Sequence, residues 1–213
     1  MKIKKLGHCC LVIEIKGKRI MTDPSHFDYG GNSVLEENLD LILITHEHAD
    51  HLHIPTLKEI LVKNPNVSII TNTSVGKLLE AENIIYTKVE DQESFEFEGI
   101  NIFGFGDKHA EIYEDYGQVQ NTGYMVDEFC YPGDSLNLPN KKVDILALPV
   151  LGPWLLMKNA INYAKEINPR IVFPVHDAPL KSFAGFVYTI PQTFLNKVNI
   201  EFKKLEIGKD EEI

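Results

Sequence analysis

Apolar residues recur along this chain in short runs that alternate with turns and with helical periods. Apolar stretches on both sides of a turn predict three β-hairpins, centred on Lys16-Gly17-Lys18, Glu98-Gly99 and Asp127-Glu128. Short stretches rich in apolar residues predict further strands at residues 41–44, 67–70, 84–89, 143–148, 171–173 and 200–205, and the stretch at 41–44 has no polar break. The acidic residues 210–212 carry no such run, and we expect them to be solvated.

Apolar residues spaced three and four apart predict helices between these strands. The predicted helices cover residues 55–64, 73–81, 156–167 and 192–198. Pro55 suits the first turn of the first helix, and Asn168-Pro169 ends the third. Strands and helices alternate between residues 41 and 89, which indicates a layered α/β arrangement. We expect loops at residues 25–38 and 110–121.

The predicted strand at residues 41–44 leads directly into a dense cluster of polar side chains, His46, His48, Asp50 and His51. Imidazole nitrogens and carboxylate oxygens bind zinc and similar divalent metals. A tight loop could direct the first pair of these residues to one metal ion and the second pair to another. A solvated histidine-rich turn is the alternative. Three of the eight histidines fall within six positions here, which favours a metal site.

Three other predicted strands are followed by residues of the same kinds, His109, Asp134 and His176. Taken alone, His109 would be a surface histidine, Asp134 a turn residue and His176 a core histidine. Functional side chains usually lie on loops that a rigid sheet holds in place. The recurrence of such residues at four strand ends therefore predicts one common site.

Composition narrows the functional classes further. A chain of 213 residues suits one domain, so we expect residues 1–213 to form one. The net charge of −10 disfavours a nucleic-acid partner, which normally meets a basic face.

The set of three cysteines, Cys9, Cys10 and Cys130, contains no CxxC pair, and we expect reduced, partly buried thiols. The apolar run at residues 9–13 is too short for a signal segment, and no run could span a membrane. We therefore expect a cytoplasmic protein without a membrane partner. Its oligomeric state stays open, a homo-oligomer included.

The sequence THEHADH at residues 45–51 resembles the HxHxDH signature of the metallo-β-lactamase superfamily. A lone histidine, a Gly-Asp pair and a late Pro-x-His follow in the order found in that superfamily. The resemblance implies an α/β fold, the αββα four-layer sandwich with two sheets inside and helices outside. It also implies a ligand set of His46, His48 and His109 for one metal ion, Asp50, His51 and His176 for the other, and Asp134 bridging both.

Leu6-Gly7-His8, Thr22-Asp23-Pro24 and residues 167–176 are similar to one branch of that superfamily, the short metal-dependent hydrolases that resemble L-ascorbate-6-phosphate lactonase. Asp177-Ala178-Pro179 departs from this branch, which has a small aromatic and glycine-containing stretch there. His48 stands where the redox di-iron branch has glutamate, and this favours a hydrolase.

The implied activity is that of a metal-dependent hydrolase whose two metal ions activate a hydroxide for attack on an ester or lactone of a small molecule. Asp50 would be both a ligand and the catalytic residue that orients the nucleophile and accepts its proton. We expect zinc, with manganese or iron as alternatives. A phosphodiester substrate, or a metal-binding sensor or scaffold without turnover, is the alternative function.

A few side chains outside the ligand set also merit attention. Asp23 is expected to brace the ligand loop, because a metal-bound histidine normally donates its other ring N–H to a carboxylate. His8 is expected near the ligands or in the pocket lining. Trp154, Tyr113 and Tyr116 suit either the rim of the site or plain packing. His26 and His53 are expected to be ordinary polar loop residues. The sequence leaves open whether the loop at 110–121 closes over a ligand.

Overall fold

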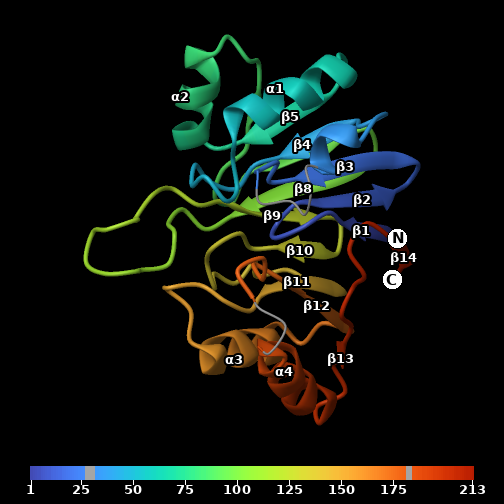
Figure 1. Cartoon of the computed structure of the whole chain (residues 1–213), viewed down its shortest axis with the longest axis vertical. Helices are drawn as coiled ribbons and strands as arrows, with labels where there is room; N and C mark the ends of the chain where they lie inside the picture. The colour runs from blue at the N-terminus through green and yellow to red at the C-terminus, as the bar shows by residue number, and fades with distance from the viewer. Residues whose placement is uncertain (27–31, 181–183) are drawn as a thin grey trace.

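The computed structural model describes residues 1–26, 32–180 and 184–213. Within these residues, two β-sheets of seven strands each face one another, and helices cover the outer face of each sheet (Figure 1). This four-layer arrangement confirms the αββα sandwich that the sequence implies. A sandwich of this kind buries an apolar face of each sheet against its partner and the opposite face against helices.

The first sheet is built from the N-terminal part of the chain and its last residues. In spatial order it contains β14 (Asp210–Glu212), β1 (Lys2–Lys5), β2 (Leu11–Ile15), β3 (Lys18–Thr22), β4 (Leu41–Leu43), β5 (Ser68–Thr71) and β6 (Thr87–Lys88). The pairs from β14 to β3 are antiparallel, and those from β3 to β6 are parallel. The parallel strands end at one edge, where the residues that follow them can meet.

The second sheet repeats this division into antiparallel and parallel strands. In spatial order it contains β7 (Ser94–Phe97), β8 (Ile100–Phe105), β9 (Gly123–Val126), β10 (Phe129–Tyr131), β11 (Ile145–Pro149), β12 (Ile171–Val175) and β13 (Glu201–Phe202). The pairs from β7 to β10 are antiparallel, and those from β10 to β13 are parallel.

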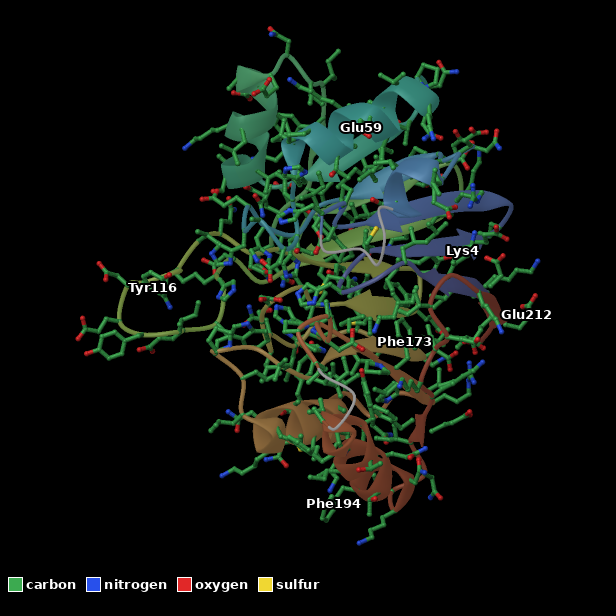
Figure 2. All side chains as sticks on the ribbon, in the orientation of Figure 1. Lys4, Glu59, Tyr116, Phe173, Phe194 and Glu212 are labelled. Carbon is green, nitrogen blue, oxygen red and sulfur yellow. The ribbon has the colours of Figure 1, made fainter. Side chains whose placement is uncertain are left out.

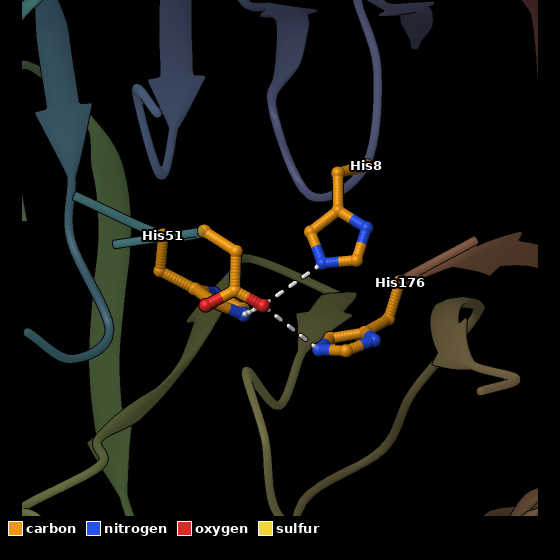
Figure 3. Close-up of side chains that lie close together, drawn as sticks. His8, His51 and His176 are labelled. Atoms are coloured by element: carbon orange, nitrogen blue, oxygen red, sulfur yellow. Dashed lines mark hydrogen bonds and ion pairs between the residues drawn. The ribbon is translucent and has the colours of Figure 1, made fainter. Parts of the chain in front are cut away.

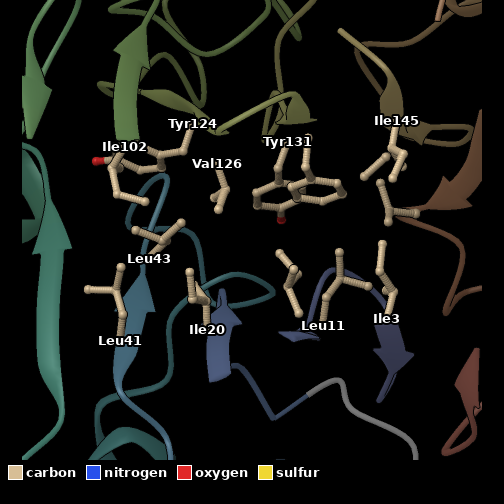
Figure 4. Close-up of a cluster of buried hydrophobic side chains, with 14 of the residues drawn as sticks. Ile3, Leu11, Ile20, Leu41, Leu43, Ile102, Tyr124, Val126, Tyr131 and Ile145 are labelled. Atoms are coloured by element: carbon tan, nitrogen blue, oxygen red, sulfur yellow. The ribbon is translucent and has the colours of Figure 1, made fainter. Parts of the chain in front are cut away.

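Alternate residues of each strand enter different parts of the core, as the pleat of a strand requires. Leu41 and Leu43 of β4 pack between the sheets, where Tyr124 and Val126 of β9 face them across the interface (Figure 4). Ile42, between the two leucines, packs on the helical side of the first sheet. The uninterrupted apolar run of the sequence thus serves both faces of a buried strand.

Two helices cover each sheet. The first sheet carries α1 (Ile54–Lys63) and α2 (Thr73–Ala81), and the second carries α3 (Met157–Ile167) and α4 (Phe186–Asn196) (Figure 1). The Asn72 side chain accepts a hydrogen bond from the Val75 backbone N–H over 3.1 Å, which caps α2. Asn168 ends α3 in the left-handed region with φ of 53°.

The acidic residues 210–212 are exposed or half-buried, in agreement with the prediction that they are solvated, but they also belong to a sheet. Residues 210–212 form β14, which pairs with β1 so that Lys2 lies opposite Glu212 and Lys4 opposite Asp210. The two ends of the chain therefore lie side by side (Figure 1). Opposite charges across an antiparallel pair favour this register, and a charged edge strand resists further pairing.

Four sequence predictions of secondary structure need correction. The helix expected at 192–198 is α4, which begins six residues earlier, at Phe186, and contains Pro191. The strands expected at 84–89 and 200–205 are reduced to β6 and β13. The loop expected at 25–38 contains a short 3₁₀ helix, η1 (Asn32–Leu35), and its residues 27–31 lie outside the described part of the chain.

Two predictions from composition can also be compared with the structure. Cys9, Cys10 and Cys130 are free thiols, as expected, but all three are fully buried. Burial raises the pKa of Cys130, which keeps this thiol protonated. Across the described residues, no helix is long and apolar enough to cross a membrane.

Candidate metal centre

The polar residues that the sequence places after four strands meet at one edge of the sandwich. β4 leads to the loop with His46 and Asp50, β8 to His109, β10 to Asp134, and β12 directly to His176. β4 and β12 lie among the parallel strands of the two sheets, and the residues that follow their carboxyl ends come together, Asp50 and His51 with His176. The prediction that these residues share one site therefore agrees with their placement.

His46, His48 and His109 form the first group. One side-chain nitrogen of each lies within 4.8 Å of the others. His46 and His109 are buried, whereas His48 is half-buried at the mouth of a cavity. The spacing of two residues in the HxH sequence thus places two imidazoles side by side, with ring centroids 4.8 Å apart.

Asp50, His51 and His176 form the second group, joined by His8. The Asp50 Oδ2 atom lies 3.2 Å from His8 Nε2 and 3.4 Å from His176 Nε2. It lies 4.0 Å from His51 Nε2. Figure 3 shows the three imidazoles arranged around one carboxylate. His8 comes from the connection between β1 and β2, so a fifth strand end supplies this site.

Asp134 lies between the two groups. Its Oδ2 atom is 3.3 Å from His109 Nε2 in the first group and 2.9 Å from His176 Nε2 in the second. Its Oδ1 atom is 3.1 Å from His51 Nε2. The Trp154 indole N–H donates a hydrogen bond to Oδ2 over 2.9 Å. Asp134 thus places one carboxylate oxygen close to imidazole nitrogens of both groups, which is the placement that a bridging ligand needs.

Several buried nitrogen and oxygen atoms at the centre of this site form no hydrogen bond with the described residues, although His51 Nε2 and Asp134 Oδ1 lie only 3.1 Å apart. They are His46 Nε2, His51 Nε2, His176 Nε2 and Asp134 Oδ1. A buried polar atom without a partner costs about 1–3 kcal/mol, so native proteins seldom keep one without a ligand. Here the atoms converge on a common space. This donor set fits divalent metal ions such as zinc.

For His51 and His109, the partner of ring atom Nδ1 shows that the other ring nitrogen, Nε2, faces the site. His51 Nδ1 lies 2.6 Å from the Asp23 carboxylate, and His109 Nδ1 lies 2.6 Å from the Ala110 carbonyl oxygen. Both partners only accept hydrogen bonds, so Nδ1 carries the proton and Nε2 of the neutral ring offers a lone pair. The His109 lone pair then faces the Asp134 carboxylate, a contact that a cation between them would stabilise.

Asp23 binds more than His51. Its Oδ1 atom accepts the Thr45 backbone N–H over 2.8 Å, and Oδ2 accepts the Thr45 hydroxyl over 2.7 Å and the Tyr131 hydroxyl over 2.5 Å. The Asp23 backbone has φ of 39°, which few non-glycine residues adopt. This buried carboxylate therefore ties the start of the ligand loop to both sheets, as the sequence prediction for Asp23 requires.

The electrostatic field of the site keeps its carboxylates ionised. Burial raises the pKa of Asp134, but His51 and His176 outweigh it and hold that pKa well below its usual range. Burial likewise raises the pKa of Asp50, but the neighbouring imidazoles of His176 and His8 more than reverse this effect. Burial lowers the pKa of His8, His46 and His48. Burial also lowers the pKa of His51 and His176, but neighbouring anionic groups, Asp134 among them, outweigh it and raise both pKa values. An anionic site that draws protons onto two of its imidazoles favours a cationic ligand.

A cavity of about 460 Å³ opens onto the site. Its polar side consists of ligand-type residues, including His48, Asp50 and Asp134. Ile112, Tyr116, Pro153 and Trp154 line the remainder, so the wall away from the polar side is apolar and aromatic. Tyr116 lies on the projecting part of the long loop between β8 and β9, at the side of the sandwich (Figure 2).

The remaining sequence predictions divide between this site and other places. Trp154 lines the cavity, whereas Tyr113 is exposed and does not line it. His53 is the N-cap of α1, where Nδ1 accepts the Thr56 backbone N–H. Its ring packs against His26, with centroids 4.8 Å apart. His26 and His53 therefore belong to a separate contact and are absent from the groups of metal-ligand type.

Sequence reasoning missed one strong interaction beside the site. The Lys5 ammonium group and the Asp177 carboxylate are 2.7 Å apart, and both side chains are buried. Lys5 has no motif around it, and 172 positions separate the pair. The departure of Asp177-Ala178-Pro179 from the resembled pattern is the one signal that could have drawn attention to this pair.

Comparison with proteins of known sequence supports the assignment of a family. A family model described as "Beta-lactamase superfamily domain" matches residues 2–176. The chain is 27% identical over 194 residues to Protein Rv0786c of Mycobacterium tuberculosis, covering 88% of this chain and 89% of that protein. It is 25% identical over 189 residues to UPF0173 metal-dependent hydrolase Ta0764 of Thermoplasma acidophilum, covering 83% of each.

Solved structures share the fold at lower identity. Igni18, described as a novel metallo hydrolase from Ignicoccus hospitalis, aligns with a TM-score of 0.78 and 17% identity over 99% of this chain and 97% of its own. CmlA, described as a diiron beta-hydroxylase from Streptomyces venezuelae, aligns with a TM-score of 0.78 and 15% identity over 100% of this chain and 54% of its own. The signature at residues 45–51, the four-layer fold and the match of the family model agree, and the chain belongs to the β-lactamase superfamily.

Proposed function

We propose that this protein is a metal-dependent hydrolase that uses two divalent metal ions to cleave an ester or lactone bond. One observation carries the proposal: the buried nitrogen and oxygen atoms of two ligand groups converge without hydrogen-bond partners among the described residues, and Asp134 lies between the groups. The name of the Thermoplasma acidophilum relative, a metal-dependent hydrolase, is consistent with it.

Each group would hold one ion. His46, His48 and His109 supply three imidazoles to the first, and Asp50, His51 and His176 supply two imidazoles and a carboxylate to the second, with Asp134 shared. Mixed nitrogen and oxygen ligands favour zinc, and manganese or iron are the alternatives. The diiron character of CmlA belongs to a protein with the same fold, so the identity of the metal needs measurement.

Bound metal would supply activation of a water molecule at neutral pH and polarisation of the attacked oxygen. Asp50 lies at the edge of the cavity with 31% of its side chain exposed, and its low pKa keeps it anionic. This carboxylate can therefore orient a water molecule and receive its proton. Trp154 holds Asp134 through its indole N–H and presents its ring to the cavity, where it can shield the reacting bond from bulk water.

The cavity wall supports an uncharged acyl substrate. Ile112, Tyr116, Pro153 and Trp154 offer apolar and aromatic surface, and no lysine or arginine from the described ranges lines the cavity. Sites for small molecules usually bind the apolar part of the ligand on such a wall and orient it with a few polar groups. A phosphodiester, which would gain from a cationic side chain, is the second candidate. Membership of the branch that resembles L-ascorbate-6-phosphate lactonase is part of the same proposal.

A substrate panel tests the proposal. The protein would be loaded in turn with zinc, manganese and iron, and turnover would be measured on carboxylic esters, lactones and phosphodiesters. Greatest kcat/KM on an uncharged ester or lactone is the expected result, with loss of turnover in the His46→Ala variant. Preference for phosphodiesters would replace the proposed substrate class. Full metal binding without turnover on any member of the panel would favour a metal-binding sensor or scaffold.

A further inference from the structure

His8 lies among the residues of the second group but lies outside the superfamily signature. Its side chain is 1% exposed, and its ring centroid is 4.1 Å from that of His176. Its Nε2 atom faces the Asp50 carboxylate (Figure 3) at 3.2 Å from Oδ2. Two roles compete for a histidine in this position. It could be an additional ligand of the second metal ion, or it could hold Asp50 by a hydrogen bond.

The other ring nitrogen of His8 decides between these roles. The backbone N–H of Ala178 donates a hydrogen bond to His8 Nδ1 over 3.2 Å. A backbone N–H can only donate, so Nδ1 is the acceptor and carries no proton. A neutral imidazole with an unprotonated Nδ1 carries its proton on Nε2. The atom that faces Asp50 is therefore an N–H donor, which has no lone pair for a metal ion.

We infer that His8 is a positioning residue: its Nε2–H holds the Asp50 carboxylate in the orientation that a metal ligand and proton acceptor needs. The inference rests on the metal role proposed for Asp50. It extends that role to a residue outside the ligand set, since second-sphere hydrogen bonds orient ligating carboxylates as well as ligating histidines.

The segment that presents the Ala178 N–H is fixed to β1. Lys5 donates to the Asp177 carboxylate over 2.7 Å and to the Pro174 carbonyl oxygen over 2.7 Å. The His176 backbone N–H donates to the His8 carbonyl oxygen over 3.0 Å. Residues 174–178 are therefore tied to residues 5–8 at several points. These contacts fix the position of His8 relative to the candidate ligand His176. They also hold the Ala178 N–H against His8 Nδ1, which selects the tautomer of His8.

The tautomer can be observed directly by nitrogen NMR. In protein with labelled histidines, the His8 resonances are assigned from their loss in the His8→Gln variant. We expect an unprotonated Nδ1 and a protonated Nε2, in metal-free and in zinc-loaded protein. A proton on Nδ1 would overturn the inference. Coupling of His8 Nε2 to an NMR-active cadmium ion in the cadmium-loaded protein would also overturn it, because His8 would then be a ligand.

A pair of variants tests the function of this N–H. Glutamine can place an amide N–H near the position of Nε2, whereas leucine keeps the volume without a donor. Competition with a chromogenic chelator should show the weaker of the two zinc affinities falling about tenfold in His8→Leu and by no more than about threefold in His8→Gln. Equal losses in both variants would indicate a ligand, and unchanged affinity in both would indicate plain packing. Either result contradicts the inference.

Two controls separate this inference from the function on which it rests. His53→Leu removes a histidine that caps α1, and its zinc affinities should match those of the wild type. If the wild type binds no zinc, the metal-dependent function fails, while the His8 tautomer can still be read in the metal-free protein. If zinc binds normally and His8 carries its proton on Nδ1, the positioning role alone fails.

Discussion

The Asp23 carboxylate and His51 Nδ1 are 2.6 Å apart, and both side chains are completely buried. From the described residues Asp23 accepts four hydrogen bonds, one at Oδ1 and three at Oδ2. All four partners donate, so the site needs an acceptor at both oxygens. A carboxylate meets this requirement and an amide cannot, because one of its two terminal atoms is itself a donor.

Asp23→Asn should therefore weaken both the fold and the metal site. The amide must place its NH₂ group against at least one buried donor, which costs about 1–3 kcal/mol. Loss of a second-sphere partner of a metal-bound histidine typically lowers metal affinity about 10–100-fold. Thermal unfolding and zinc competition measure the two effects. The matched control is Asp144→Asn, which affects an exposed ion pair with Arg170 and should change both quantities little. Wild-type zinc affinity in Asp23→Asn would show that His51 needs no such support.

Metal stoichiometry tests the division of the ligands into two groups. We expect about two equivalents of metal per chain in protein purified without chelator, because each group has enough donors for one ion. His109→Ala should lose the ion of the first group and His176→Ala that of the second, leaving about one equivalent in each variant. Elemental analysis gives these values. One equivalent in the wild type, unaffected by His176→Ala, would contradict a binuclear site.

Removal of metal should destabilise the protein. A ligand that binds only the native state stabilises it by about 4 kcal/mol at a thousandfold excess over its Kd. In a protein of this size that corresponds to a rise of roughly 8–16 °C in Tm. We therefore expect chelated protein to melt lower and zinc to restore the Tm. Magnesium serves as the control, since it prefers oxygen ligands and should restore little. Equal Tm values with and without chelator would argue against a preformed site.

The candidate ligand set at the strand ends could be predicted from the sequence because its signal is local. The HxHxDH spacing, together with an apolar run before it, fixes both the identity of the side chains and the edge to which a strand delivers them. That first motif is what indicates that three later residues are candidate ligands, because each of them also follows a strand. They are His109, Asp134 and His176. Their convergence in the structure depends on the parallel pairing of strands far apart in sequence.

The rest of the site depends on long-range contacts that no local sequence pattern indicates. Lys5 and Asp177 are 172 positions apart, and the contact between His8 and Asp50 spans 42. The helix predicted at 192–198 exists but begins earlier: α4 starts at Phe186 without a side-chain cap and continues through Pro191. Tertiary packing of Val187 and Leu195 on the second sheet outweighs the local cost of proline.

Acid stability should depend on Glu90, which joins the base of the long loop to α2. Burial raises the pKa of this carboxyl, but hydrogen bonds from Thr73, Gln120 and Lys88 outweigh it and lower the pKa to about 2 from the usual 4.5. A depressed pKa contributes stability above about pH 4.5, and this contribution is lost as the pH falls towards 2. Glu90→Gln should therefore lose about 1 kcal/mol at neutral pH, and the difference from the wild type should shrink on acidification.

Denaturant unfolding between neutral and acid pH measures this difference. Glu96→Gln removes the same charge from an exposed position of β7 and serves as the control. A constant difference between Glu90→Gln and the wild type across that range would show that the ionised form of Glu90 contributes nothing.

The sharpest prediction concerns Asp50, because the proposed function gives it two roles that substitution can separate. Asparagine keeps one oxygen and nearly the same shape, so His51, His176 and Asp134 can still hold the second ion. The lost features are the negative charge and the capacity to accept a proton beside the nucleophile. Loss of a positioned acid–base group typically lowers the rate about 10²–10⁴-fold. Asp50→Asn should therefore retain most of its metal and lose most of its kcat.

His46→Ala provides the contrast, since it removes a whole ligand and should empty or cripple the first metal position. The comparison is kcat and metal content for both variants, measured on any ester that the wild type cleaves. Near wild-type turnover in Asp50→Asn would show that Asp50 is only a ligand. Loss of metal from Asp50→Asn in proportion to its loss of turnover would lead to the same conclusion, because the decrease in rate would then follow from an empty site and not from a missing proton acceptor.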